Sequence, residues 1–127
     1  MPSYSEPAHA LDFLVSEANG HLSREQVTLT AAQGDLVAGT VMAKVTATGN
    51  YVPYDDDLNA TVAGAGIAAG VLAYPAPNNA ATQLITIIAR QAEVQDELLV
   101  WEASNDTTEI NAGKAELIAA GIIVRNK

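Results

Sequence analysis

One short acidic run offers the residues that are best suited to chemistry. Asp55, Asp57 and Asn59 match the first three oxygen-ligand positions of a calcium-binding loop. The match then fails, because Ala60 stands where such a loop needs glycine and Gly66 stands where it needs a bidentate glutamate. A glycosidase would need a second, spaced pair of carboxylates, and the sequence suggests none. The run therefore predicts a solvated acidic turn.

The sequence has few histidines and no cysteine, so catalysis or metal binding by these residues is not expected. His9 and His21 are the only two histidines of the 127-residue chain, and both lie in an irregular N-terminal segment. A catalytic histidine is normally held by packing and by a second hydrogen bond, which such a segment does not supply. The chain has no cysteine, so it can have no disulfide, no thiolate nucleophile and no thiolate metal site.

Two glycine-containing segments match phosphate-binding loops only in part. Gly113 and Lys114 are adjacent, but Thr108 replaces the first required glycine and Ala115 replaces the required hydroxyl. Residues 64–70 are rich in glycine, yet no helical pattern follows them, which favours a strand with close backbone contacts. We therefore expect no cofactor, no bound metal and no enzymatic activity.

The elements that would position any site are mostly strands. Apolar alternation and β-branched residues predict strands at residues 40–48, 51–54, 66–74, 83–88, 92–94 and 122–124. One helix is predicted between the N-cap side chains of residues 105–107 and Gly121, which suits a left-handed C-terminal cap. The predicted fold class is mixed α/β and mostly β, a small β-rich domain with one C-terminal helix and an extended N-terminal arm.

We predict that the N-terminal arm spans residues 1–33 and that the globular domain spans residues 34–127. Apolar residues in the arm are sparse, except that residues 24–30 alternate, with Val27 and Leu29 on one side. This segment is either an ordinary first strand of the domain or an arm that adds itself as a strand to another protein's sheet. The pattern alone does not choose between these two interpretations.

Composition narrows the classes of partner. Lys and Arg total 6 against 15 Asp and Glu, which gives a formal net charge of −9. Such a surface repels phosphate groups, so we expect no nucleic-acid partner and no membrane partner. The N-terminal segment lacks the basic and apolar regions of a signal peptide. With 1 Phe and 1 Trp, the core is predicted to be thin, and subunit contacts would add to its stability.

Six short segments carry a resemblance to a known family. They are SREQVTL at residues 23–29, LVAGTVMAKVT at 36–46, GNYVPYD at 49–55, AAGVL at 68–72, LVW at 99–101 and LIAAGIIVR at 117–125. Their order and spacing resemble the lambda-type head decoration proteins of tailed bacteriophages. The resemblance covers most of the chain from residue 23 onward.

The resemblance implies a structural cement protein. Such a protein forms a homotrimer on the outer surface of the capsid, binds the major capsid protein and stabilises the shell against the pressure of packaged DNA. It is made in the bacterial host cytoplasm and ends in the virion. In the family the N-terminal arm pairs with strands of the capsid protein, which implies a capsid-binding role for Arg24, Glu25, Gln26, Val27, Thr28, Leu29 and Thr30, with Val27 and Leu29 as apolar contacts.

Two other function classes remain as alternatives. The first is a small β-domain that binds a ligand or carries a cofactor. A cofactor carrier would use Lys44, although the Met-Lys-Met hairpin tip of carrier domains is missing. A carbohydrate-binding module would need an exposed aromatic platform, for which Tyr51, Tyr54 and Trp101 are the candidates.

Overall fold

The computed structural model describes residues 9–126, so the first eight residues of the predicted N-terminal arm lie outside the described residues. The only α-helix of the described chain precedes the last strand. The elements are β1 (Leu14–Glu17), β2 (Arg24–Leu29), β3 (Val41–Lys44), β4 (Tyr51–Pro53), the 3-10 helix η1 (Asp57–Ala60), β5 (Ala68–Leu72), β6 (Gln83–Ile88), β7 (Ala92–Gln95), the 3-10 helix η2 (Asp96–Leu98), α1 (Thr107–Ala119) and β8 (Ile122–Arg125).

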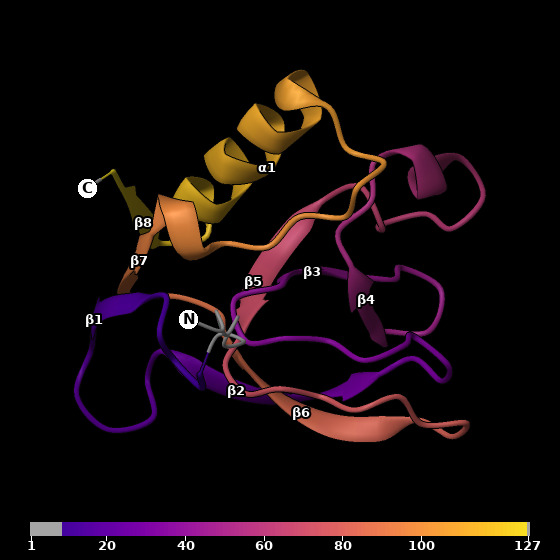
Figure 1. Cartoon of the computed structure of the whole chain (residues 1–127), viewed down its shortest axis with the longest axis horizontal. Coiled ribbons are helices and arrows are strands. Elements are labelled where there is room, and N and C mark those ends of the chain that lie inside the picture. The colour runs from indigo at the N-terminus through magenta and orange to yellow at the C-terminus, as the bar shows by residue number, and fades with distance from the viewer. Residues whose placement is uncertain (1–8, 127) are drawn as a thin grey trace, which may run out of the picture.

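The strands form a small closed barrel and a separate three-stranded sheet. The barrel order is β2-β4-β3-β5-β6, and the sheet order is β1-β7-β8. A single parallel pair, Leu29 with Tyr51, closes the barrel between β2 and β4. The helix α1 lies against β8 and β5, where it bridges the sheet and the barrel (Figure 1). The predicted fold class, mostly β with one C-terminal helix, is confirmed.

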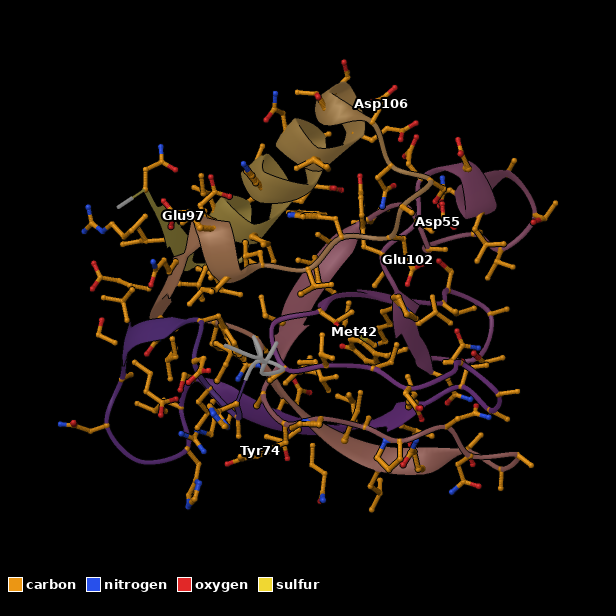
Figure 2. All side chains as sticks on the ribbon, in the orientation of Figure 1. Met42, Asp55, Tyr74, Glu97, Glu102 and Asp106 are labelled. Atoms are coloured by element: carbon orange, nitrogen blue, oxygen red, sulfur yellow. The ribbon has the colours of Figure 1, made fainter. Side chains whose placement is uncertain are left out.

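Two apolar clusters hold these layers together. The larger one lies between α1, the three-stranded sheet and the barrel, and includes the fully buried Phe13 and Leu117. The second fills the barrel around Leu29, Met42 and Ile87, and Figure 2 shows Met42 inside the ring of strands. Of the 26 buried apolar residues in the described chain, 8 are alanines. Small side chains contribute less burial energy than large ones, so this core gives less stabilisation than one of the same number of large residues.

The helix begins and ends at the residues that its capping chemistry predicts. The Asp106 carboxylate accepts a hydrogen bond from the Glu109 N–H at 2.9 Å, and the Glu109 side chain accepts one from the Asp106 N–H at 2.7 Å. Gly121 follows the helix with φ +95°, a conformation that glycine adopts without strain. The neighbouring Asn105 is not the cap. It is buried and donates to the Tyr54 carbonyl oxygen at 3.1 Å.

Two differences from the predicted strands have local causes. The strand predicted at residues 40–48 ends at Lys44, because the chain turns back there and the Val45 N–H bonds the Asn50 carbonyl oxygen at 2.8 Å. The sequence does not predict β1, which pairs antiparallel with β7. Its register shifts between Leu14 and Ser16, so the two-residue alternation that marks a strand is broken.

A close helix–ring contact explains the glycine of the partial phosphate-loop pattern. A Cβ atom at position 113 would lie 2.6 Å from the Trp101 Cζ3 atom and 3.3 Å from the Tyr54 Cζ atom. These two rings pack edge to face, with their centroids 5.5 Å apart. Gly113 therefore allows α1 to approach the rings and has no phosphate-binding role in this arrangement.

Replacing this glycine should loosen the helix. We expect Gly113→Ala to lower the free energy of unfolding by about 1–2 kcal/mol, because overpacking costs about 1–3 kcal/mol and the helix preference of alanine offsets up to about 1 kcal/mol. Asn111→Ala, at an exposed position of the same helix, is the matched control and should be neutral or stabilising. Urea denaturation measures both. An unchanged midpoint for Gly113→Ala would contradict the close contact.

A second prediction concerns Glu116, whose Oε1 atom accepts a hydrogen bond from the Ala68 N–H at 3.3 Å. Burial raises the pKa of this carboxyl above its ordinary value of 4.5, and nearby Asp56 adds to the effect. A raised folded-state pKa stabilises the fold below pH 4.5, and this contribution is lost as the pH rises through the folded-state pKa. Glu116→Gln keeps the acceptor without the charge.

The Glu116→Gln variant should therefore be more stable than the original protein at pH 7. The two proteins should converge below about pH 4, where Glu116 is protonated in both the folded and the unfolded states. Thermal unfolding followed across this pH range gives the comparison. A variant that is less stable than the original protein at pH 7 would show that the charged form of Glu116 is favoured.

Candidate functional site

The acidic run serves the backbone of its own turn. The Asp55 Oδ1 atom accepts hydrogen bonds from the Asp57 N–H at 3.1 Å and the Ser104 hydroxyl at 2.9 Å. The Asn59 Oδ1 atom accepts from the N–H groups of Gly64 and Gly66 at 2.9 and 3.1 Å. These oxygens bond groups of the same irregular turn and of the neighbouring Ser104. Within residues 9–126, no group of three or more His, Asp or Glu side chains is placed to hold a metal ion.

Lys114 and the three candidate aromatic residues have structural contacts as well. Lys114 forms an ion pair with Asp96 at 2.8 Å. Tyr51 and Tyr54 are only 7 % and 1 % exposed, and Trp101 packs on Tyr54. None of these three aromatic residues therefore offers the open platform that a carbohydrate-binding module would need. In the described part of the chain, no helix is both long and apolar enough to cross a membrane.

The predicted capsid-binding residues fall on β2 and just after it, within the barrel wall. β2 pairs antiparallel with β6 over its whole length, from Arg24 opposite Ile88 to Leu29 opposite Gln83. Leu29 is fully buried in the barrel cluster, and Val27 packs against the same cluster. The predicted sidedness of these two residues is confirmed. In this conformation their side chains are occupied by the chain's own core.

One edge of β2 is open over most of its length. The Ser23 carbonyl oxygen bonds the Ala89 N–H at 2.8 Å, so the backbone groups of odd-numbered residues here point toward β6. The Thr30 N–H bonds the Tyr51 carbonyl oxygen at 2.9 Å, so the even-numbered residues point the other way. The one pair that joins β2 to β4 in the described chain is Leu29 opposite Tyr51, and its parallel geometry uses the Thr28 carbonyl oxygen. The backbone groups of Gln26 and the N–H of Thr28 have no strand partner on this edge. A row of free backbone groups like this is a template for another strand.

A polar network fixes the start of β2. Arg24 donates to the Glu17 carboxylate through Nη2 at 2.6 Å and through Nε at 3.1 Å, and its Nη1 group donates to the Tyr74 hydroxyl at 2.8 Å. The Ser23 hydroxyl donates to the same carboxylate. The hydrogen bonds from Arg24 hold the pKa of Glu17 below its ordinary value. β2 is therefore anchored at its first residue by charge and at its last residue by burial.

The exposed aromatic side chain next to this network is one that the sequence analysis did not single out. Tyr74 is 41 % exposed, and Figure 2 places it at the outer surface of the barrel, on the side where β2 and β6 run. A tyrosine just after a buried strand and just before Pro75 is the signal that could have identified it. His21 lies in the loop before β2 and lines the same surface groove as Tyr74 and Arg24.

The chain was compared with known protein families and with curated proteins. A family model described as bacteriophage lambda head decoration protein D matches residues 3–122 of the chain. A comparison with curated proteins finds no match.

The Glu17–Arg24 contact should contribute stability that depends on pH. Because the folded-state pKa of Glu17 is lowered, this contribution is complete above the ordinary value of 4.5 and is lost as the pH falls through the folded-state pKa. We expect Glu17→Gln to destabilise the protein by about 1 kcal/mol at pH 7 and by much less near pH 3. Chemical denaturation at the two pH values tests this. A difference that stays constant with pH would exclude an ionic contribution.

Proposed function

The chain belongs to the bacteriophage lambda head decoration protein D family, and from this membership we propose that it binds the outer surface of a phage capsid as a homotrimer. The family is structural, and its role is capsid decoration. Our proposal adds the major capsid protein as the partner, stabilisation of the shell against the pressure of packaged DNA, and synthesis in the cytoplasm of the bacterial host. The function includes no nucleic acid, membrane or cofactor.

The open edge of β2 supports a specific mode of capsid binding. The backbone groups of Gln26 and the N–H of Thr28 would pair with an extended segment of the major capsid protein, which adds as a strand to the barrel wall. β2 does not need to leave β6 for this, so Val27 and Leu29 remain in the core. Residues 24–30 are then the capsid-binding segment through their backbone, and the proposed division into an arm of residues 1–33 and a domain of residues 34–127 is a division of function.

The net charge of the chain and the three binding edges of a trimer are both consistent with capsid decoration. A net charge of −9 is tolerated on the outer surface of a shell, since the capsid wall separates it from the packaged DNA. A short added strand is a weak contact by itself. Three copies of the edge on one trimer would act together, because after the first contact the others form at high effective concentration. A shell subunit bridged in this way to its neighbours resists outward pressure.

Oligomeric state and capsid binding can be measured on the intact chain. Light scattering should give three times the 13.2 kDa chain mass, and the protein should co-sediment with expanded capsids of its own phage. A monomer that does not sediment with capsids would contradict the proposal. Deletion of residues 1–32 is unsuitable as a test, because it removes β1, β2 and the buried Phe13 from the fold.

Proline substitutions separate the open edge from the paired edge. Thr28→Pro removes an N–H that points away from β6, so the barrel should persist while capsid binding falls at least tenfold. Val27→Pro is the matched control, because it removes an N–H that points toward β6 and should destabilise the barrel itself. Circular dichroism reports the fold and co-sedimentation reports binding. Full capsid binding by a folded Thr28→Pro protein would rule out strand addition at this edge.

A further inference from the structure

A groove on the outer face of the barrel has the features of a ligand site. It has a volume of about 370 Å³ and is lined by His21, Arg24, Glu25, Gln26, Tyr74 and Thr86. A second groove of about 150 Å³ lies beside it, and Tyr74 and Thr86 line both. Tyr74 and Thr86 therefore lie where the two grooves meet. The larger volume is in the range of sites that hold one small molecule.

The Tyr74 ring is held in place before any ligand arrives. Its hydroxyl accepts a hydrogen bond from Arg24 at 2.8 Å, and Arg24 is itself fixed by Glu17 at 2.6 Å. The ring is nevertheless 41 % exposed. A tyrosine with a fixed orientation loses little conformational freedom on binding, and its face offers an apolar surface to a flat partner.

Polar side chains beside the ring are free to bond a ligand. Gln26 on β2 and Thr86 on β6 are direct partners in the antiparallel register, so their side chains lie next to each other on the outer face. Neither side chain makes a hydrogen bond to another group within residues 9–126. Together they offer an amide group and a hydroxyl, which can both donate and accept hydrogen bonds.

The charged residues of the groove are already neutralised. Arg24 is paired with Glu17 at 2.6 Å, and Glu25 is paired with Arg90 at 2.7 Å. A ligand with a net charge would therefore find no free counter-charge from these residues, and the chain's overall charge of −9 repels an anion. An exposed aromatic ring, free hydroxyl and amide groups, and Arg and Glu side chains that are already paired together match a neutral polyhydroxylated molecule.

We propose that this groove binds a neutral carbohydrate. One sugar ring stacks on Tyr74 while its hydroxyls bond the side chains of Gln26 and Thr86, and the smaller groove, with Pro75 and Leu84 in its lining, receives a neighbouring sugar. This inference goes beyond capsid decoration and does not depend on it. The groove is shallow, so a single site binds in the millimolar range, and several copies on one particle add avidity.

The test is a titration of the full-length 15N-labelled protein, followed through the backbone amide signals. The neutral probes are maltotriose, the N-acetylglucosamine trimer and lactose, and the charge control is trigalacturonate. At least one neutral probe should shift the amides of residues 21–26, 74 and 86, and trigalacturonate should shift them less. If no neutral probe shifts these amides, or if trigalacturonate shifts them most, the proposal is wrong.

Three variants test whether sugar binding depends on the Tyr74 ring. Tyr74→Ala should weaken the best neutral probe at least tenfold, whereas Tyr74→Phe keeps the ring face and should retain most of the affinity. Ile123→Ala, an exposed apolar change on β8, should have no effect. Equal affinity in Tyr74→Ala and the original protein would overturn the proposal. Capsid binding should survive Tyr74→Ala and sugar binding should survive Thr28→Pro, so failure of one role is distinguishable from failure of the other.

Discussion

The pairing of β2 with β6 is the contact on which the rest of the structure depends. It spans six residue pairs and adds β2 to the sheet that the pair of β2 with β4 closes into a barrel. At its far end it places Leu29 in the barrel core beside Tyr51, where a single pair completes the ring. At its near end it places Arg24 within reach of Tyr74. The proposed capsid-binding site is the backbone edge of β2, and the proposed sugar groove is lined by side chains on the outer face of the same strand.

Elements whose signals are local could be predicted from the sequence. The helix was predictable because Asp106 and Gly121 act through their immediate neighbours, and β6 was predictable because four of its six residues are β-branched. The position of β2 was not, because its alternation fits both a barrel strand and a free arm. Only the long-range pairing with β6 decides between them in the described chain, and such pairing leaves no mark in a short window of sequence.

The candidate site shows the same limit more strongly. The residues 24–30 were identified through family resemblance, but the open edge depends on which neighbours a strand lacks, and this is a property of the whole sheet. Tyr74 was missed because the sequence does not show that Tyr51 and Tyr54 are buried while Tyr74 is exposed. Asp55 and Asn59 had the right types for a metal site, yet their oxygens are used by backbone N–H groups of the same turn.

The free edge of β2 also affects how copies of the protein behave toward one another. An unpaired strand edge can pair with the edge of another copy, which is a route to aggregation. Each copy carries a charge of −9, and the repulsion between copies acts over about 8 Å at physiological ionic strength. The acidic surface thus opposes aggregation of a protein whose β2 edge is partly unpaired. Concentrated salt removes this protection, and storage at low ionic strength preserves it.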